Sequence, residues 1–333
     1  MFIIAEAGVN HNGDMQTAKA LVDAAAEAGA DAVKFQTFRA QELVSTSTPK
    51  AKYQTESTGA HESQFDMIKK LELSSSVHAA LVQRCRERGI LFLSTAFDTE
   101  SADLLETFSM PAYKIPSGEI TNWPFLEYLA SKNKPIILST GMSDLGEVEE
   151  AVGVLRAAKC SELVILHCTS SYPTPPASVN LRAMQTIADT FHTPVGLSDH
   201  TMGIEISLAA TALGASVIEK HFTIDRSLPG PDHKASLEPG ELRSMVQGIR
   251  NVEAALGDGK KHAMQAEEDV KNVARRSIVA RLTIPKGTRI AKDMLAFKRP
   301  GTGIPPSQLS AVVGRGAART IPADSLIQLV DLE

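Results

Sequence analysis

The sequence predicts a (β/α)8 barrel followed by a small β-rich domain, and three observations carry this fold class. Within residues 1–257, eight short apolar runs alternate with eight amphipathic stretches of helical period. Each apolar run is nearly continuous, as in a parallel strand that is covered on both faces. No Gly-x-Gly-x-x-Gly motif follows the first run, which disfavours the alternative, an open doubly wound sheet. Eight repeated units in about 250 residues fit the size of a (β/α)8 barrel.

The expected elements can be assigned in order, because polar or turn residues bound each apolar run. The expected strands are Phe2–Ala7, Ala32–Gln36, Leu91–Thr95, Tyr113–Pro116, Ile136–Thr140, Leu163–Cys168, Val195–Ser198 and Val217–Phe222. The expected helices are Met15–Glu27, Val77–Arg88, Ser101–Thr107, Pro124–Ser131, Glu147–Ala157, Leu181–Thr190, Ile204–Leu213 and Leu242–Leu256. Gly29, Gly89 and Gly214 each follow a helical pattern, where a left-handed residue commonly ends a helix.

One segment, Phe38–Ser74, interrupts the alternation. It has little periodicity and many Ser, Thr and Gln residues. It is too long for an ordinary connection between a strand and a helix. We therefore expect it to form a functional lid over one face of the barrel.

A second domain is expected after the polar turn Gly257-Asp-Gly-Lys-Lys. Residues 258–275 are predicted to be a linker and residues 276–333 a small β domain. Within it, Arg281-Leu-Thr-Ile-Pro is echoed by Ala318-Arg-Thr-Ile-Pro, which indicates a pseudo-symmetric pair of units. About 60 residues are marginal for a stable core, so we expect packing on the barrel or on a second subunit. The expected strands are Ser277–Leu282, Ala317–Ile321 and Leu326–Leu329.

The composition excludes several classes of protein. The 333 residues are 43% hydrophobic and 22% charged, which is typical of a soluble globular enzyme and not of a disordered chain. No apolar run reaches the ~18 residues that a membrane span needs. The N-terminus lacks a basic region and a cleavage site, and the three cysteines show no paired spacing. A cytoplasmic location without disulfides is therefore expected.

The net charge of −5 conceals an asymmetry along the chain. From Lys271 to the end there are 11 basic and 4 acidic residues, against 23 basic and 35 acidic before it. Such a tail could contact nucleic acid or an acidic protein surface. It has no arginine-rich run and no Tyr or Trp to stack on bases, so we expect no nucleic-acid partner.

Polar residues follow or end all eight expected strands. In a (β/α)8 barrel the carboxyl ends of the strands meet at one mouth, which is where such enzymes place their chemistry. Eight such endings together indicate an enzyme. The polar endings are Glu6 with Asn10–Gly13, Lys34 with Gln36, Ser94–Asp98, Lys114 with Ser117–Glu119, Ser139–Met142, His167–Pro173, Ser198–Thr201 and Glu219–Phe222.

Several of these groups are hydrogen-bond donors that suit a phosphate or carboxylate: Lys34, Lys114, Ser117, Ser139 and Ser198. A single lysine is usually a surface residue or a salt-bridge partner. Two lysines within apolar strands are costly to bury without an anion, which favours a binding site. A Schiff base on either lysine is the competing hypothesis.

His200 and His221 end neighbouring strands, so they can approach each other. Neutral imidazoles suit a divalent transition metal, although two histidines alone are a weak signal. The carboxylates Glu6, Glu119, Asp199 and Asp232 are expected near the same mouth, as metal ligands, general bases or hydroxyl acceptors. Phe97 and Tyr172 offer apolar faces to a substrate, and Cys168 is expected to be a small buried side chain.

The motifs at the strand ends resemble those of the bacterial sialic acid synthases, and the likeness runs essentially from end to end. The ending Phe297-Lys-Arg-Pro-Gly is similar to the antifreeze-like (SAF) domain of that family. The barrel motifs that carry the resemblance are Glu6-Ala-Gly-Val-Asn-His-Asn-Gly, Lys34-Phe-Gln-Thr, Ser94-Thr-Ala-Phe, Lys114-Ile-Pro-Ser-Gly-Glu, Ile137-Leu-Ser-Thr-Gly-Met, His167-Cys-Thr-Ser-Ser-Tyr-Pro, Gly196-Leu-Ser-Asp-His-Thr, Ile218-Glu-Lys-His-Phe and Gly230-Pro-Asp-His-Lys-Ala-Ser.

The resemblance implies a metal-dependent condensation of phosphoenolpyruvate with N-acetylmannosamine, giving N-acetylneuraminate and phosphate. It implies Mn²⁺, with Mg²⁺ or Co²⁺ as alternatives, held by His200 and His221, and Glu6 near the reacting carbons. It also implies a domain-swapped homodimer in which Arg299 reaches the sugar in the other subunit. The residues it assigns to phosphoenolpyruvate are Lys34, Gln36, Thr95, Lys114, Ser117, Ser139, Ser170 and Ser198, and those it assigns to the sugar are Phe97, Glu119, Tyr172, Asp232 and Arg299.

One position departs from the pattern, since some members have Asn where Ser170 stands. The sugar also stays open, because legionaminic acid synthases, which use 2,4-diacetamido-2,4,6-trideoxymannose, share the segment after Pro231. A spore-coat polysaccharide synthase would share the chemistry. Two alternatives of other classes are a Schiff-base aldolase and a non-catalytic carbohydrate- or ice-binding protein.

Overall fold

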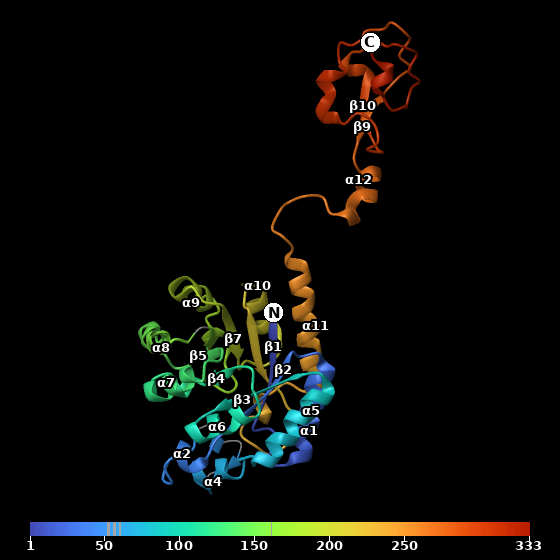
Figure 1. Ribbon diagram of the computed structural model, residues 1–333. Helices are drawn as coiled ribbons and strands as arrows, with labels where there is room; N and C mark the ends of the chain where they lie inside the picture. The colour runs from blue at the N-terminus through green and yellow to red at the C-terminus, as the bar shows by residue number, and fades with distance from the viewer. Residues whose placement is uncertain (52–53, 56–57, 60, 161) are drawn as a thin grey trace. The chain divides into compact units, whose positions relative to one another are not determined.

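The computed structural model describes residues 1–333 apart from 52–53, 56–57, 60 and 161 (Figure 1). The chain divides into two compact units, Met1–Gly257 and Asp258–Glu333. Among the described residues, no helix is both long and apolar enough to cross a membrane.

The first unit is a closed barrel of eight parallel strands in sequential order, with helices outside it (Figure 1). The predicted fold class is therefore confirmed. Each predicted strand is present, with ends that differ by at most a few residues. The strands are β1 Phe2–Gly8, β2 Ala32–Thr37, β3 Leu91–Ala96, β4 Tyr113–Ile115, β5 Ile136–Ser139, β6 Leu163–Cys168, β7 Val195–Asp199 and β8 Val217–His221.

The predicted outer helices are present as well, and local signals explain where they begin and end. Asp144 and Glu147 form a capping box at the start of α8, and Gly29 ends α1 in the left-handed region with φ 83°. The helices are α1 Met15–Ala28, α5 Ser75–Arg88, α6 Thr99–Thr107, α7 Trp123–Ser131, α8 Leu145–Ala157, α9 Ala183–Phe191, α10 Glu205–Ala212 and α11 Pro239–Leu256.

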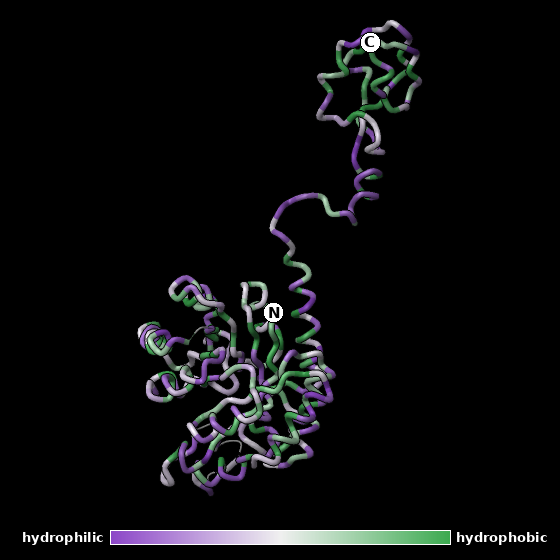
Figure 2. Tube along the Cα trace, in the orientation of Figure 1, coloured by the Kyte–Doolittle hydropathy of each residue, from purple (hydrophilic) through white to green (hydrophobic). Residues whose placement is uncertain are grey.

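The core of the first unit lies between the strands and these helices. The strands are buried almost throughout, and α1 presents Leu21, Val22 and Ala25 to them. Figure 2 shows the resulting pattern, in which β1 is hydrophobic and α11 alternates between hydrophobic and hydrophilic residues. Side chains that point into the barrel at its carboxyl end are therefore free to be polar.

The segment predicted to be a lid includes the short helices α2 Ala40–Leu43 and α4 Gln64–Lys69 in the part that the structure describes. Its described residues form a separate apolar cluster with Val9, built from Phe38, Ala40, Met67, Ile68 and Leu71. The segment between β2 and α5, residues 38–74, is called the excursion below.

The second unit contains α12 Glu268–Ala274 and one antiparallel pair, β9 Ser277–Ala280 with β10 Leu295–Lys298. The predictions of strands at Ala317–Ile321 and Leu326–Leu329 are wrong, because these runs make only isolated bridges. Pro322, directly after the first run, lacks the N–H that a continued ladder needs. The short 3-10 helices of the chain are η1 Ser117–Glu119, η2 Pro176–Ser178, η3 His233–Ala235, η4 Gln265–Glu267, η5 Lys292–Met294, η6 Pro306–Ala311 and η7 Leu329–Asp331.

The two echoed segments of the second unit pair at equivalent positions. Ile284 and Ile321, each the fourth residue of its copy, exchange backbone hydrogen bonds of 2.8 and 2.9 Å. The hydroxyl of Thr283 accepts from Ala323 N at 3.3 Å, and that of Thr320 accepts from Lys286 N at 3.4 Å. The sequence repeat is therefore a local two-fold arrangement in space.

Candidate active site

A cavity of about 530 Å³ opens at the carboxyl ends of the barrel strands, and each of the eight strands contributes to its lining. Every barrel residue that the resemblance assigns to a substrate or the metal lies on its wall. Arg299 is exposed in the second unit and precedes a cis proline. The predicted residues that the cavity brings together are Glu6, Lys34, Gln36, Thr95, Phe97, Lys114, Ser117, Glu119, Ser139, Ser170, Tyr172, Ser198, His200, His221 and Asp232.

The deepest part of the cavity holds a buried charge network centred on Glu219. Its carboxylate accepts from Lys114 at 3.0 Å and from Ser198 at 2.9 Å, and it lies 3.5 Å from Lys34. Lys34 also pairs with Glu6 at 2.8 Å and donates to Thr95 at 2.7 Å. Strand register explains the contacts, because Glu6 and Lys34 are directly paired on β1 and β2, as are Ser198 and Glu219 on β7 and β8.

The network shifts the pKa values of its members in different directions. Burial raises the pKa of Glu6 to about 7, against the opposing charge of Lys34. Burial also works to raise the pKa of Glu219, but the charges of Lys114 and Lys34 outweigh it and lower that pKa below its usual range. Burial lowers the pKa of Lys114, while in Lys34 the carboxylates overcome burial and raise the pKa. Near pH 7, Glu6 is therefore the carboxyl group poised to gain or lose a proton.

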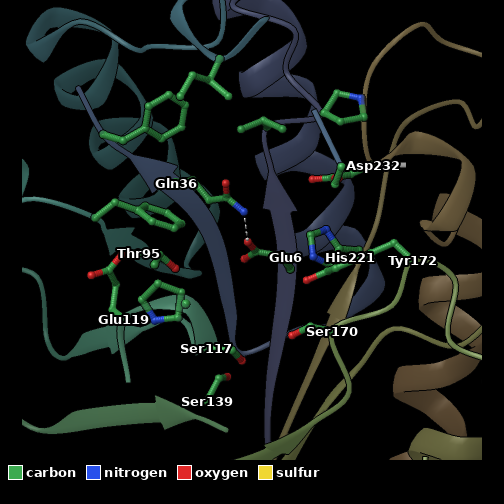
Figure 3. A pocket seen from close by; sticks show the side chains of 18 of the residues that line it. Glu6, Gln36, Thr95, Ser117, Glu119, Ser139, Ser170, Tyr172, His221 and Asp232 are labelled. Atoms are coloured by element: carbon green, nitrogen blue, oxygen red, sulfur yellow. Dashed lines mark hydrogen bonds between the residues drawn. The ribbon is translucent and has the colours of Figure 1, made fainter. Parts of the chain in front are cut away.

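Hydroxyl groups gather at one end of the cavity. Figure 3 shows Ser117, Ser139 and Ser170 together, on the opposite side of Glu6 from Asp232. The hydroxyl of Ser117 accepts from Gly141 N at 2.8 Å, and a Cβ at Gly141 would lie 2.2 Å from the Ser170 hydroxyl. The buried Ser139 hydroxyl has no hydrogen-bond partner among the described residues. A buried hydroxyl in that state can form a hydrogen bond to a ligand at this end.

His200 and His221 lie at the ends of β7 and β8, with ring centroids 5.4 Å apart. The Nδ1–H of His200 donates to Thr169 O at 2.9 Å, which leaves its Nε2 as an acceptor. Burial lowers the pKa of His221 well below its usual value, and its Nδ1 has no partner within the described part of the chain. Tyr172 packs on His200 at 4.2 Å between ring centroids.

This arrangement fits a divalent transition metal. Each imidazole has a ring nitrogen that can bind a metal when it is deprotonated, and the carbonyl behind His200 is the outer partner that metal-ligating histidines use. The described residues contain no group of three or more His, Cys, Asp or Glu that could hold a metal. A metal would therefore have these two protein ligands and take the others from water or substrate.

The sequence of the chain matches two known families. A model of the NeuB family matches residues 21–261, and a model of the SAF domain matches residues 275–333. The chain belongs to the NeuB family. It is an enzyme, as the resemblance in its motifs implied, and its second unit is a SAF domain.

The relatives of this NeuB-family chain cover nearly its whole length. It is 51% identical to N,N'-diacetyllegionaminic acid synthase of Campylobacter jejuni, over 98% of both chains. It is 50% identical to the enzyme of that name from Legionella pneumophila, over 98% of this chain and 93% of the relative. A crystal structure of N-acetylneuraminic acid synthetase from Leptospira borgpetersenii with citrate is 37% identical, with TM-score 0.71, over 81% of this chain and 89% of that one.

Two carboxylates of this NeuB-family enzyme have positions that were not expected from the sequence. Glu219 lies at the centre of the network but had no predicted role; its spacing of two from His221 on one strand is the signal that places both on the inner face. The expectation that Asp199 lies at the mouth is wrong. Asp199 follows the inward Ser198 and therefore points out of the barrel, where it binds Lys220 at 2.8 Å and Ser207 at 2.7 Å.

The excursion supplies a set of lining residues that the sequence analysis did not assign. Most of them are apolar, and several of these form the cluster around Phe38 and Met67 described above. No short-range motif identifies them, because they come together only when the excursion folds back over Val9. The cavity is therefore polar in its depth and partly apolar at its outer edge.

Proposed function

We propose that this enzyme condenses phosphoenolpyruvate with 2,4-diacetamido-2,4,6-trideoxymannose to give N,N'-diacetyllegionaminic acid and phosphate. The relatives support the legionaminic branch, because two synthases of that acid are 50 and 51% identical while the neuraminic acid synthetase is 37% identical. Neuraminate was the first expectation from the sequence, and these identities favour legionaminate.

The observation that carries the reaction class is one cavity with two chemically distinct ends. Lys34, Lys114 and the cluster of serines suit the carboxylate and phosphate of phosphoenolpyruvate. On the other side of Glu6, the two histidines and Asp232 suit a sugar aldehyde and its hydroxyl groups. Two substrates held face to face in this way gain the rate advantage of proximity.

The bonds made and broken follow from that arrangement. C3 of phosphoenolpyruvate attacks the aldehyde carbon, so that a carbon–carbon bond forms and positive charge develops at C2. Water then adds at C2, and the C–O bond to phosphate breaks. Glu6, whose pKa is near 7, is suited to move the proton of that water. When bound by His200 and His221, a divalent metal, which we propose to be Mn²⁺, would polarise the aldehyde oxygen.

Two other functions are weighed against this proposal. N-acetylneuraminate synthesis would use the same polar end and differ only in the sugar. A Schiff-base aldolase would need an uncharged lysine, yet Lys34 is paired with Glu6 and its pKa is raised. Lys114, whose pKa is lowered, is the residue on which that alternative would rest.

The partner subunit is also a proposal. Following the family resemblance, we propose that Arg299 of a second copy completes the sugar end of the cavity in a domain-swapped homodimer. Arg299 is exposed on the SAF domain, so its guanidinium is accessible to a partner.

The test is phosphate release from phosphoenolpyruvate with Mn²⁺, using the diacetamido sugar or N-acetylmannosamine, with and without EDTA. EDTA-sensitive release that is faster with the diacetamido sugar supports the proposal. Faster release with N-acetylmannosamine would move the enzyme to neuraminate synthesis. EDTA-resistant turnover with a product trapped on Lys114 by borohydride would support the aldolase instead.

A further inference from the structure

One part of the cavity wall has no role in the reaction derived above, apart from the contact with the sugar that was expected of Phe97. It consists of Val9, Phe38, Met67, Ile68, Leu71 and Phe97, here called the apolar wall. Phe38 and Phe97 meet edge to face with ring centroids 6.0 Å apart. Met67 is 4% exposed and Leu71 is 7% exposed, so water has little access to this surface.

The apolar wall lies one step further out than the reacting centre. Every second residue of β2 and of its continuation lines the cavity, namely Lys34, Gln36 and Phe38. Lys34 belongs to the deep charge network, and Gln36 bonds Glu6 at 3.3 Å. Phe38 is therefore the next inward position toward the mouth. A sugar whose aldehyde lay at the level of Glu6 and His221 would have room to extend its far end toward this wall.

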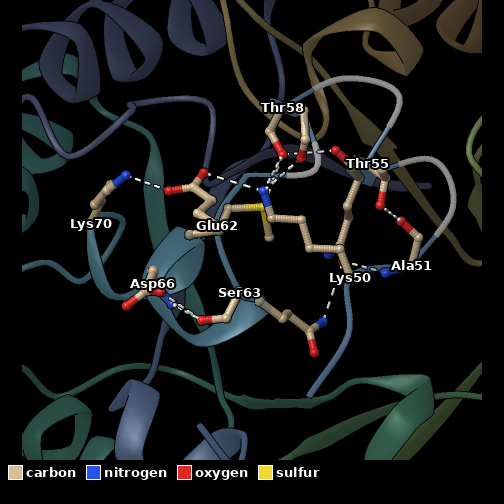
Figure 4. Close-up of polar contacts among 12 residues, drawn as sticks. Lys50, Ala51, Thr55, Thr58, Glu62, Ser63, Asp66 and Lys70 are labelled. Carbon is tan, nitrogen blue, oxygen red and sulfur yellow. Dashed lines mark hydrogen bonds and ion pairs between the residues drawn. The ribbon is translucent and has the colours of Figure 1, made fainter. Parts of the chain in front are cut away.

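The wall is held in place by polar contacts within the excursion (Figure 4). The amine of Lys50, whose side chain is 3% exposed, donates to Thr58 at 2.9 Å and to Gly59 O at 3.1 Å, and pairs with Glu62 at 3.2 Å. Glu62 also binds Lys70, and the hydroxyl of Thr58 lies 3.5 Å from the sulfur of Met67. These bonds join the middle of the excursion to α4, which presents Met67 and Ile68.

The other end of the excursion is fixed to the loop after β1. Gly13 has φ +75°, and a Cβ there would lie 2.5 Å from the carbonyl oxygen of Lys70. Only glycine permits so close a backbone contact in that conformation. The wall is thus a built surface, anchored at both α4 and the β1–α1 loop.

We propose that the apolar wall binds the C6 methyl group of the sugar and so selects a 6-deoxy substrate over one with a hydroxyl at C6. This inference rests on the proposed function, whose sugar has a methyl group at C6. None of the six wall side chains can donate a hydrogen bond to a hydroxyl or accept one well, so a hydroxyl buried there loses its bonds to water. The excursion also brings Gln54 and Gln64 to the cavity, hydrogen bonded at 3.3 Å, and these amides suit the polar acetamido group.

The test compares kcat/KM for two pairs of sugars. The first pair differs only at C6: 2,4-diacetamido-2,4,6-trideoxymannose and its 6-hydroxy counterpart. The second differs only at C4: the same sugar and 2-acetamido-2,6-dideoxymannose. We expect a preference of about 10- to 100-fold for the 6-deoxy member, the range typical of an added hydroxyl in an apolar pocket.

The two pairs separate the two proposals. Equal rates in the first pair with a preference in the second would overturn the role of the wall and leave the proposed function standing. A preference in the first pair alone would keep the wall and overturn the diacetamido substrate. Absence of phosphate release with all three sugars would overturn both.

Substitutions test whether Met67 of the apolar wall sets the preference for the 6-deoxy sugar. Met67→Gln should reduce the 6-deoxy preference toward unity, because the amide can pair with the hydroxyl. Met67→Leu should retain it, since the volume and polarity are kept. Met264→Gln, the same change at a residue 57% exposed in the second unit, should have no effect. An unchanged preference in Met67→Gln, with wild-type KM for phosphoenolpyruvate and a cooperative thermal transition, would overturn the assignment.

Discussion

The amine of Lys114 and the carboxylate of Glu219 lie 3.0 Å apart and join β4 to β8 across the inside of the barrel. Both side chains are about 5% exposed. Glu219 also accepts a hydrogen bond from the hydroxyl of Ser198 and lies near the amine of Lys34. Before substrate binds, this buried carboxylate neutralises part of the positive charge of the two lysines. Without it, only a bound anionic substrate could do so. The deep end of the cavity is therefore prepared for an anion before phosphoenolpyruvate arrives.

Glu219→Gln should destabilise the free enzyme by about 3 kcal/mol, because it leaves buried lysines without their counter-charge. Phosphoenolpyruvate should then stabilise the variant more than the wild type, since its charges replace the lost carboxylate. Urea unfolding with and without phosphoenolpyruvate measures both effects. Glu241→Gln removes a half-exposed partner of Arg226 and should cost less than about 1 kcal/mol. Equal stability of Glu219→Gln and wild type would contradict the balancing role.

His221→Ala should abolish EDTA-sensitive phosphate release, because a single remaining imidazole cannot hold the metal. Binding of Mn²⁺, followed by electron paramagnetic resonance of the free ion, should weaken at least about 100-fold. The control is His192→Ala, which changes a histidine at the end of α9 that does not line the cavity. Wild-type turnover in His221→Ala would rule out the proposed ligand set.

Asp232→Asn should stabilise the enzyme at pH 7 while weakening its sugar binding. Burial raises the pKa of Asp232 to about 6, above the value of 3.8 expected when unfolded. The folded state thus binds this proton more tightly, so stability is full below pH 3.8 and is lost as pH rises to about 6. Removing the charge should restore up to about 3 kcal/mol at pH 7 and nothing at pH 4.

The same substitution has a kinetic signature. In the wild type, KM for the sugar should rise as pH falls below about 6, because a protonated Asp232 loses acceptor capacity. In Asp232→Asn, KM should be about 10-fold higher or more at pH 7, and this pH dependence should disappear. Asp225→Asn provides a control on the same loop, because the pKa of that exposed carboxyl is lowered by Ser227. A pH-independent KM in the wild type would refute the assignment.

Arg299→Ala should raise KM for the sugar at least about 10-fold and leave KM for phosphoenolpyruvate near wild type. Lys298→Ala, the exposed neighbour that pairs with Asp324, is the matched control. If Arg299 acts in the other subunit, mixing Arg299→Ala with His221→Ala should regain activity, up to about a quarter of wild type for random dimers. No recovery on mixing, with exchange of subunits verified, would exclude the swapped arrangement.

The barrel could be predicted from the sequence because its signals are local. Parallel strands such as Ile136–Ser139 are covered on both faces, so each is an apolar run that the next helix delimits. The cavity residues could be predicted for a related reason, since the barrel gathers all the strand ends at one mouth. The prediction for Asp199 was wrong because successive residues of a strand point to opposite faces. Ser198 points into the barrel, so Asp199 points out of it.

Other features depend on contacts distant in the chain, which no local pattern reveals. β10, which was not predicted, pairs with the predicted strand β9 across a stretch that contains Pro285 and Gly287. The excursion has little helical or strand period, yet several of its described residues bind the amine of Lys50. Its contribution to the cavity appears only when Met67 and Val9, far apart in sequence, belong to one cluster.

The insertion of the excursion between β2 and α5 has a consequence for how such an enzyme can diverge. The groups proposed to make and break bonds stand on the strands, which the whole barrel holds in register. The surface proposed to choose the sugar is mostly one contiguous stretch that is not part of any strand. Mutations there can alter the product while the reaction is conserved, so exchange of residues 38–71 between synthases should change the sugar that is accepted.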